Sequence, residues 1–446
     1  MFDSILNRLK DKRILVLGFG REGKSTLRFL QKYLPQNEIG VADKNTAAFA
    51  DFQFPLAGRA LSEVEVPAVA SQLHFHSGDD YLQSIYDYDI VIKTPGISLK
   101  DFDTKGVEIT SQTDLFLSEF HRQTIGISGT KGKSTTTSLI YHLLKSVGKD
   151  AILTGNIGIP CFDVMEDIEP DSVIVYELSA HQMEYVHNGP KVGVLLNVFE
   201  EHLDHFGTFE RYKNAKLNLL RFMQEDDFAV IHDSLLDDVL PLFVNQTVFS
   251  TMDFAINESK LPILGTHNLL NVKAALCACS AFGIDELELI PYLYTFKPLE
   301  HRLERVGTFG GVTFFNDSIS TIPQAAVAAC ETLKKVDFLL LGGFDRDIDY
   351  TPLIDFLLQG IVPHLLFTGH AGERMMEALK GREVATTLVS YSSMEEAFAY
   401  LADHAKRGDV CLLSPAASSY DQYKNFEERG RKFKGLAEQF VLSNLK

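Results

Sequence analysis

The fold is decided at one stretch, Gly126-Ile-Ser-Gly-Thr-Lys-Gly-Lys-Ser-Thr135. A short apolar run, Thr124 to Ile127, enters it, and a helix-forming run, Ser138 to Lys145, follows it. A strand, a glycine-rich turn and a helix in this order hold phosphate, because backbone N–H groups and the helix N-terminus face the phosphate oxygens. We expect Lys133 to reach the β- and γ-phosphates of a nucleotide and the Ser134 hydroxyl to ligate Mg²⁺.

The turn departs from the strict phosphate-loop pattern G-x-x-x-x-G-K-[ST]. Ile127 stands where the first glycine belongs, which leaves a compact G-T-K-G-K-S-T form. The alternative is a glycine-rich turn without a ligand, but Lys131 and Lys133 would repel each other there unless an anion compensates. The sequence therefore favours a site for ATP, with contacts expected from Gly129, Thr130, Lys131, Gly132, Lys133, Ser134 and Thr135.

Length and composition limit the remaining possibilities. A chain of 446 residues is too long for one hydrophobic core, and 45% hydrophobic with 11% aromatic residues is typical of a globular protein. The formal net charge of −18 argues against nucleic acid or an anionic membrane surface as a partner. A bound phosphate would need a local basic site, which the glycine-rich turn supplies.

The cysteines and the apolar runs indicate a cytoplasmic protein. The five cysteines are scattered without zinc-site spacing, so we expect small buried residues in a reducing compartment. The first ten residues are mixed and charged, unlike a secretory signal. No apolar run reaches membrane-spanning length, so we expect no membrane insertion.

Strand and helix signals alternate through three blocks, residues 1–100, 101–298 and 299–446. Buried-strand runs end in glycine or polar residues, as in parallel α/β sheets that bind ligands at the carboxyl ends of their strands. We therefore predict an α/β fold with a Rossmann-like first domain, a central phosphate-loop ATPase domain and a Rossmann-like third domain. The clearest strand runs are 13–17, 38–42, 89–92, 124–127, 172–176, 192–196, 311–315, 338–341, 364–367 and 410–413.

A second glycine-rich turn, Gly18-Phe-Gly-Arg-Glu-Gly23, follows the first strand, with Asp43 at the end of the next. This G-x-G-x-x-G pattern indicates a dinucleotide or any other diphosphate, since backbone amides recognise pyrophosphate whatever is attached to it. The alternative is that the glycines serve only tight packing of the strand on the helix.

Several polar side chains of the second and third blocks are candidates for chemistry. Glu177 ends a strand and His202 lies in an acidic stretch, and both could hold Mg²⁺. Asn268 and Asn271 lie one helical turn apart, where the alternative for Asn268 is a helix cap. The plain alternative for His202 is a surface histidine. Further candidates are Lys216, otherwise a solvated helix lysine, Arg302, which could reach a phosphate across a closing cleft, and Asp317, which could orient a ribose or a cation.

Taken together and in this order, these motifs resemble the Mur ligases, the ATP-dependent amide-forming enzymes of peptidoglycan precursor synthesis. The resemblance covers nearly the whole chain. Folylpolyglutamate synthetase shares the core but lacks a glycine-rich first domain of this kind. The shared elements are G-T-K-G-K-S-T, Glu177-Leu-Ser, Gly155-Asn-Ile-Gly158, Asn197 with Glu201-His202, Ala215-Lys216-Leu217, Gly265-x-His-Asn-x-x-Asn271 and His301-Arg302.

Within the family the chain is most similar to the branch that adds D-glutamate to UDP-N-acetylmuramoyl-L-alanine. The G-x-G-x-x-G turn, Asn316-Asp317-Ser318 and the long string from Ser414 to Gly430 carry this similarity. The Asp-Asn-Pro-Arg motif of the diaminopimelate-adding members is missing. The resemblance implies a monomer that uses ATP, D-glutamate and the UDP-sugar in cell-wall synthesis, and so serves cell shape and division.

The resemblance also implies roles for individual residues. The first block would bind the UDP-sugar, and the second would bind ATP with two Mg²⁺ ions, using a Lys216 carbamylated by CO₂. Catalytic roles fall on Lys133, Glu177, His202, Lys216 and Arg302, and metal ligation on Ser134, Glu177, His202 and Lys216. ATP contacts outside the loop fall on Asn268, Asn271, Arg302 and Asp317. UDP-sugar contacts fall on Gly18, Phe19, Gly20, Asp43, Lys44, Thr94, Pro95, Gly96, Asn156, Ser179, Gln182 and His202, and D-glutamate contacts on Thr321, Arg346, Ser414 and Tyr420.

Two positions depart from the family pattern near the acceptor. Ile319 stands where many members have lysine, and Arg346 replaces a lysine of one branch. Three other functions stay open: a family member with a different acceptor, a nicotinamide-dependent oxidoreductase built on Gly18 to Gly23, and a non-catalytic protein switched by ATP.

Overall fold

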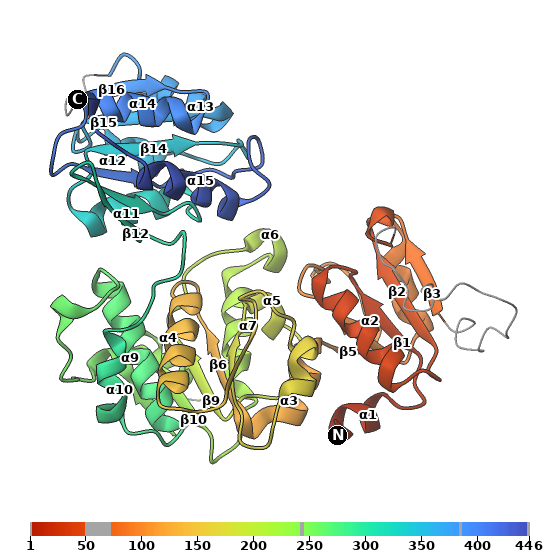
Figure 1. Cartoon of the computed structure of the whole chain (residues 1–446). Coiled ribbons are helices and arrows are strands. Elements are labelled where there is room, and N and C mark those ends of the chain that lie inside the picture. The colour runs from red at the N-terminus through yellow and green to blue at the C-terminus, as the bar shows by residue number, and fades with distance from the viewer. Residues whose placement is uncertain (1, 50–72, 241–244, 383–385, 444–446) are drawn as a thin grey trace, which may run out of the picture. The chain divides into compact units, whose positions relative to one another are not determined.

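The computed structural model describes residues 2–49, 73–240, 245–382 and 386–443. The chain forms two compact units, the first made of Met1–Pro262 and Thr266–Phe296, the second of Ile263–Gly265 and Lys297–Lys446. Two sheets lie in the first unit and one in the second (Figure 1). The predicted α/β fold is confirmed, since within the described residues every sheet is parallel apart from one edge pair of strands.

The first sheet has the strand order β3-β2-β1-β4-β5. Its central strand β1 is buried throughout, as its unbroken apolar sequence predicts. The sheet extends past residue 100, because β5 is its edge strand. Its elements are α1 (Asp3–Leu9), β1 (Ile14–Leu17), α2 (Arg21–Tyr33), β2 (Ile39–Asp43), β3 (Leu73–Ser77), β4 (Ile90–Lys93) and β5 (Glu108–Thr110).

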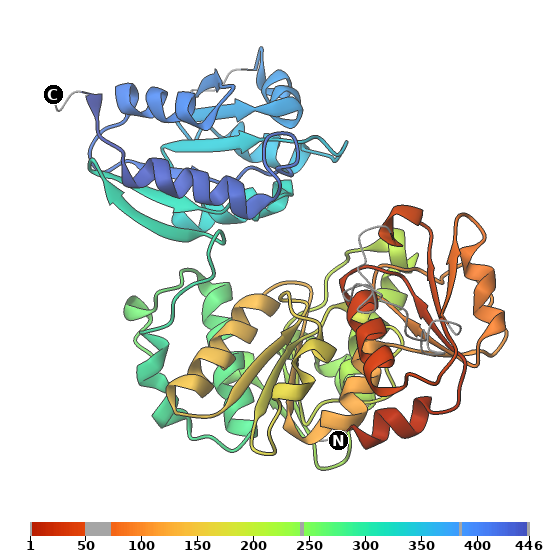
Figure 2. The same ribbon diagram turned by 45° about the vertical axis from the view of Figure 1, so that its right-hand side comes forward.

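The central sheet has the strand order β11-β10-β9-β6-β8-β7. Helices α4 and α9 cover one face and α7 packs on the other, as the turned view shows (Figure 2). Its strands are β6 (Thr124–Ser128), β7 (Ala151–Gly155), β8 (Val173–Glu177), β9 (Val192–Leu195), β10 (Phe228–Ile231) and β11 (Gln246–Val248). Its helices are α3 (Gln112–Phe120), α4 (Lys133–Ser146), α5 (Ala180–Met183), α6 (Leu203–Phe206), α7 (Phe209–Arg221), α8 (Leu236–Val239), α9 (Thr266–Ala281) and α10 (Glu286–Leu293).

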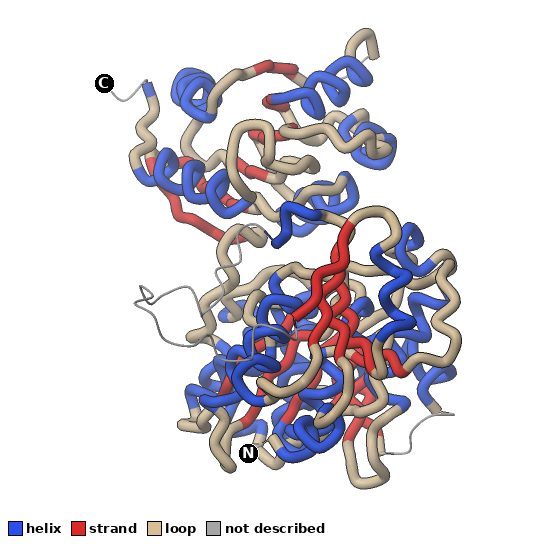
Figure 3. Tube along the Cα trace, turned by 90° about the vertical axis from the view of Figure 1, so that its right-hand side faces the viewer, coloured by secondary structure: helices blue, strands red, loops and turns tan. Residues whose placement is uncertain are grey.

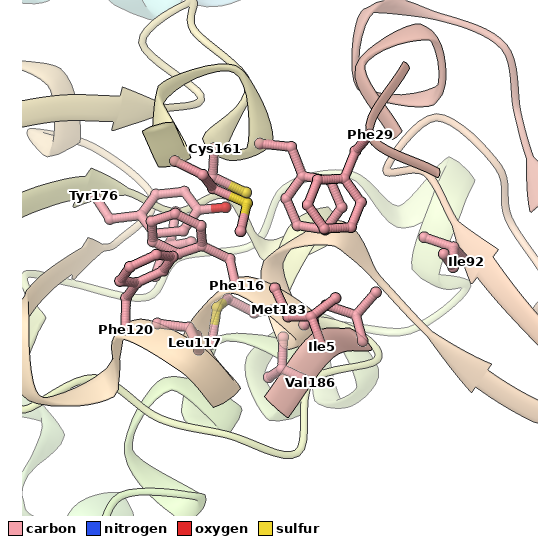
Figure 4. Close-up of a cluster of buried hydrophobic side chains, with 14 of the residues drawn as sticks. Ile5, Phe29, Ile92, Phe116, Leu117, Phe120, Cys161, Tyr176, Met183 and Val186 are labelled. Carbon is pink, nitrogen blue, oxygen red and sulfur yellow. The ribbon is translucent and has the colours of Figure 1, made fainter. Parts of the chain in front are cut away.

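One hydrophobic core joins these two sheets into a single unit. Phe29 of α2 and Ile5 of α1 lie in the same buried cluster as Phe116 of α3 and Tyr176 of β8 (Figure 4). The Phe29 ring also contacts Phe162, with ring centroids 4.5 Å apart. Because the two sheets share this core, contacts between them are part of the folded unit.

The sheet of the second unit has the order β12-β13-β17-β14-β15-β16, with β12 antiparallel to β13. Alternate residues of β14 enter two cores: Leu339 and Leu341 face the core of α11 to α13, while Phe338 and Leu340 face that of α14 and α15. Figure 3 shows strands in red with helices in blue beside them. The strands are β12 (Glu304–Phe309), β13 (Val312–Asn316), β14 (Phe338–Gly342), β15 (His364–Thr368), β16 (Thr387–Ser390) and β17 (Val410–Leu413). The helices are α11 (Pro323–Leu333), α12 (Thr351–Leu357), α13 (Gly369–Leu379), α14 (Met394–His404) and α15 (Phe426–Glu438).

The five cysteines match the prediction of small buried residues. All are free thiols in the interior. Among the described residues no helix has the length and apolar character to span a membrane.

Candidate functional site

The predicted phosphate loop connects β6 to α4. Gly129 has φ +155° and Gly132 has φ +88°, conformations that side-chain-bearing residues rarely adopt. A Cβ on Gly132 would lie 2.4 Å from the Asn271 Oδ1 atom of α9. Glycine is therefore required there both by the turn and by its neighbour.

The lysine side chains of the loop are already paired within the protein. The Lys133 ammonium donates to the carbonyl oxygens of Gly129 (2.9 Å) and Thr130 (3.0 Å), and Lys131 forms an ion pair with Glu201 at 2.5 Å. The expectation that two lysines need an external anion is therefore wrong for Lys131, because Glu201 compensates its charge. The case for phosphate rests on the shape of the loop and on Lys133.

The loop is fastened to the next strand by the segment after β9. Asn197 accepts the Lys131 backbone N–H through Oδ1 (2.8 Å) and the Thr130 N–H through its carbonyl (2.9 Å). The Thr130 hydroxyl lies 3.0 Å from the Tyr212 hydroxyl. Ser134 and Thr135 follow Lys133 in the first turn of α4, where backbone N–H groups favour anions.

Glu177 presents one free carboxylate oxygen at the end of β8. The residue is buried, and its Oε1 accepts the Asn156 Nδ2 donor at 2.8 Å. Its Oε2 has no hydrogen-bond partner among the residues that the structure describes. A buried, unpartnered carboxylate oxygen is costly unless a cation or water meets it, so this donor fits a divalent cation.

Lys216 is buried in α7 and points at the phosphate loop. Its ammonium donates to the Gly129 carbonyl at 2.7 Å and lies 4.9 Å from the centre of the Tyr212 ring. Burial, aided by the nearby charge of Lys133, lowers the pKa of the Lys216 amine well below its usual value. The alternative of a solvated helix lysine is wrong for Lys216.

His202 lies at the start of α6 in a left-handed conformation, φ 57°. Burial lowers the pKa of its imidazole, and its ring centre lies 4.7 Å from that of His181. The half-exposed side chain is 3.7 Å from Glu201. Within the part of the chain that is described, no three His, Cys, Asp or Glu side chains form a metal-binding group. Of the four metal ligands predicted from the sequence, only His202 and Glu177 belong to these residue types.

The two asparagines of α9 share a face, as their spacing predicts. The Asn271 Nδ2 donates to the Asn268 Oδ1 at 3.0 Å. The helix starts at Thr266, so Asn268 lies inside the first turn and the alternative of a cap is wrong. Asn271 is buried against Gly132, which brings it to the phosphate loop.

The glycine-rich turn of the first sheet is built around Asp43 and Thr94. The Phe19 N–H donates to the Asp43 carboxylate at 2.6 Å, and Gly20 is the N-cap of α2. A Cβ on Gly18 would lie 2.0 Å from the Thr94 Oγ1, and one on Gly23 would lie 2.1 Å from a backbone oxygen. The alternative, in which the glycines allow tight packing at this turn, is thus supported for Gly18 and Gly23. Lys44 is exposed and pairs with Asp79, and Pro95 and Gly96 lie at the surface beside Thr94.

Gln182 ties this turn to the central sheet. Its Oε1 accepts the Ser179 N–H in a capping box, and its Nε2 donates to Glu22 at 2.7 Å. Close by, Lys93 pairs with Glu184 at 3.0 Å and is almost fully buried. We did not single out Glu22 or Lys93 from the sequence, although Glu22 lies within the glycine motif and Lys93 precedes Thr94.

Glu22 predicts a pH-dependent stability. Burial raises the pKa of its carboxyl from 4.5 to about 7. Because the folded protein binds this proton more tightly than the unfolded chain does, the carboxyl contributes stability that is fully present below pH 4.5. This stability is lost as the pH rises through the folded-state pKa of about 7. Glutamine at this position does not ionise, so it avoids this loss. Between pH 5 and pH 8 the free energy of unfolding of Glu22→Gln should therefore rise by about 2 kcal/mol relative to that of the natural protein. Urea unfolding at both pH values measures this, and an equal pH dependence of the two proteins would contradict it.

The polar residues at the carboxyl edge of the second unit's sheet converge on Asp317. Its carboxylate accepts the Leu303 N–H (2.9 Å) and the hydroxyls of Ser320 (2.5 Å) and Ser414 (2.8 Å). Burial raises the pKa of Asp317 to about 6. Ser414 is fully buried with its hydroxyl on Asp317, whereas Arg302 is exposed.

The other predicted acceptor contacts lie on neighbouring loops of this edge. The Arg346 guanidinium is exposed and donates to the Thr321 carbonyl at 3.0 Å. Tyr420 is 71% exposed on the loop after β17. The structure brings Arg346 and Thr321 together, while Tyr420 extends into solvent.

The fold and the loop geometry define an α/β protein with a nucleoside-triphosphate-type phosphate loop. Residues 127–240 match the Mur ligase middle domain, and residues 301–417 match the Mur ligase glutamate ligase domain. The chain belongs to the Mur ligase family.

Named relatives are similar over nearly the whole chain. A UDP-N-acetylmuramoylalanine–D-glutamate ligase of Symbiobacterium thermophilum is 31% identical and covers 96% of this chain and 98% of its own. One from Acidobacterium capsulatum is 31% identical, with 96% of each chain covered. The MurF ligase of Thermotoga maritima, solved in complex with ADP, shares the fold with a TM-score of 0.59 and 18% identity, over 98% of this chain and 97% of that one.

Proposed function

We propose that this protein is the ATP-dependent ligase that joins D-glutamate to UDP-N-acetylmuramoyl-L-alanine in peptidoglycan precursor synthesis. The observation that carries the proposal is the 31% identity to D-glutamate ligases over 96% of the chain. The geometry around Lys133 supports ATP as the energy source, because a glycine loop, a helix N-terminus and a lysine meet there. Its substrates are cytoplasmic metabolites, so we place the reaction in the cytoplasm and expect a monomer.

Different residues of the central sheet would bind the phosphates, the Mg²⁺ and the nucleoside of MgATP. Lys133 and the loop N–H groups hold the phosphates. Ser134, Glu177, His202 and Lys216 would hold Mg²⁺, which offsets the negative charge that separates the two reacting anions. The free oxygen of Glu177 is the donor that best fits a cation. Asn268 and Asn271 would line the nucleotide.

Lys216 is proposed to carry a carbamate. Among the described residues no carboxylate forms an ion pair with this buried ammonium, which donates to the Gly129 carbonyl and faces the Tyr212 ring. Addition of CO₂ to the neutral amine forms an N–C bond and releases one proton, giving an anionic group on a side chain aimed at the phosphate loop. The carbamate would balance the positive charge of Lys133 and add an oxygen ligand for metal.

The UDP-sugar and D-glutamate would bind on different sheets. The UDP part would lie on the first sheet at Gly18, Phe19, Gly20, Asp43, Lys44 and Thr94 to Gly96, with Asn156, Ser179, Gln182 and His202 toward the sugar. D-Glutamate would lie on the second unit at Thr321, Arg346, Ser414 and Tyr420. Since Ser414 is buried, its contact would be through Asp317 or its own backbone.

The proposed reaction has two steps. The carboxylate of the alanyl group attacks the γ-phosphorus of ATP, ADP leaves, and an acyl phosphate forms. The amine of D-glutamate attacks the acyl carbon, the C–O bond to phosphate breaks, and the ammonium proton is released. Lys133 stabilises charge on the transferring phosphoryl group, which is the main contribution that a protein makes to such a step.

Acceptor choice tests the proposal. Phosphate release from ATP is followed with UDP-N-acetylmuramoyl-L-alanine and, in turn, D-glutamate, L-glutamate, L-lysine or diaminopimelate. Release with D-glutamate alone is expected. Turnover with another acceptor would keep the family and reject the substrate, and NADH binding without turnover would favour an oxidoreductase.

Arg346 is expected to bind a carboxylate of the acceptor. Its guanidinium is exposed beside Thr321. Arg346→Ala should raise the KM for D-glutamate roughly 10- to 100-fold, since a hydrogen bond to a charged group contributes about 1.5–3 kcal/mol. Initial rates at varied D-glutamate measure this, with the exposed Arg382→Ala as the control. An unchanged KM would contradict the assignment.

A further inference from the structure

A buried arginine lies behind the loops on which the acceptor would bind. Arg429 of α15 is 4% exposed, and burial lowers the pKa of its guanidinium to about 10. Among the described residues its hydrogen-bond acceptors are one hydroxyl and three backbone carbonyls, and none of them is an acidic side chain. The nearby charge of Asp421 offsets only part of the cost of burying this cation, so the geometry of its hydrogen bonds has to be specific.

The guanidinium joins two loops that follow different strands. Its Nε donates to the Ser318 hydroxyl (3.0 Å) and its Nη2 to the Ser318 carbonyl (2.8 Å), just after β13. Nη2 also donates to the Ala417 carbonyl (3.1 Å), and Nη1 to the Ser418 carbonyl (3.3 Å), both after β17. The planar fork of arginine can satisfy these directions together, whereas a lysine has a single nitrogen.

The loop after β14 is bound to the loop after β17, and so indirectly to Arg429. The Phe344 N–H donates to the Ser418 carbonyl at 2.9 Å, and a Cβ on Gly343 would lie 2.2 Å from the same oxygen. The loops that follow β13 and β17 therefore contact Arg429 directly, and the loop that follows β14 contacts it through Ser418. These are the loops that carry the predicted acceptor contacts Thr321, Arg346, Ser414 and Tyr420.

We propose that Arg429 is a positioning residue that sets the relative placement of the three acceptor-binding loops, and so the affinity for the acceptor amino acid. The inference rests on the proposed function in naming that acceptor D-glutamate. We assign Arg429 no contact with substrate, because each of its three side-chain nitrogens already donates to a group of the protein. It acts through the backbone of Ser318, Ala417 and Ser418.

The test compares Arg429→Lys with Lys432→Met, an exposed control on the same helix that removes an ion pair with Glu395. Arg429→Lys is expected to raise the KM for D-glutamate roughly tenfold or more, since small misplacements are costly, while the KM for ATP and for the UDP-sugar stay within about twofold. Hydrogen exchange should rise at residues 316–321 and 414–420. A lower melting temperature with an unchanged D-glutamate KM would overturn the proposal, as it would mean a purely structural role.

A milder variant keeps the test decisive if Arg429→Lys does not fold. Ser318→Ala removes the hydroxyl that accepts from Nε and leaves the carbonyl contacts in place. It should raise the D-glutamate KM in the same direction by a smaller factor, and no rise would overturn the proposal. If the natural protein does not use D-glutamate, the proposed function fails, and the exchange data alone then decide whether Arg429 orders these loops.

Discussion

Lys133→Met is expected to lower kcat/KM for ATP-dependent phosphate release by roughly a hundred- to a thousandfold, the usual cost of losing one preorganised charge at the transferring group. The ammonium sits over the loop between the carbonyls of Gly129 and Thr130, where it can turn to phosphate without rearranging the backbone. Methionine keeps most of the side-chain volume but cannot donate. Initial rates at varied ATP measure the effect.

A matched control lies on the same helix. Lys145 is in the last turn of α4, is exposed and pairs with Asp150 at 3.3 Å. Lys145→Met should leave kcat/KM within about twofold, since an exposed ion pair contributes at most about 1 kcal/mol to stability and nothing to the loop. Retention of more than about a tenth of the activity in Lys133→Met would contradict a phosphate-binding role.

Lys216→Met is the second large effect. The side chain is buried against Gly129, so methionine can fill its space while the amine that would accept CO₂ is lost. We expect a fall of roughly a hundredfold or more in kcat, because an anionic ligand near the reacting phosphates disappears. The natural protein should also lose activity in CO₂-depleted buffer and regain it with bicarbonate, and the variant should not respond.

Lys213 supplies the control on α7. It pairs with Asp238 at 2.5 Å at the surface side of the helix. Lys213→Met should keep both full activity and the bicarbonate response. A Lys216→Met protein with normal kcat, or a natural protein indifferent to bicarbonate, would contradict the carbamate.

Local patterns were enough to predict the buried strands and the phosphate loop. Runs such as 338–341 are apolar without interruption, as strands covered on both faces must be, and the structure places β14 there. The short edge strand β5 was missed because three residues carry no periodicity. Its pairing with β4 is decided by tertiary packing.

Partners distant in sequence account for most of what the sequence could not predict at the site. The ion pair of Lys131 with Glu201 joins residues 70 positions apart, and it removed our charge argument for an anion. Glu22 meets Gln182 across 160 positions. Neither local motif predicts such a contact. The first depends on the pairing of β6 with β9 in one sheet, and the second depends on the core that two sheets share.

The fate of one oxygen atom tests whether an acyl phosphate forms. UDP-N-acetylmuramoyl-L-alanine labelled with ¹⁸O in the alanyl carboxylate is incubated with the protein, MgATP, bicarbonate and D-glutamate, and the released phosphate and the nucleotide product are analysed by mass spectrometry. If an acyl phosphate forms, the released phosphate carries ¹⁸O and the product carries one D-glutamyl amide. Unlabelled phosphate, or a nucleotide sugar of unchanged mass, would contradict this mechanism.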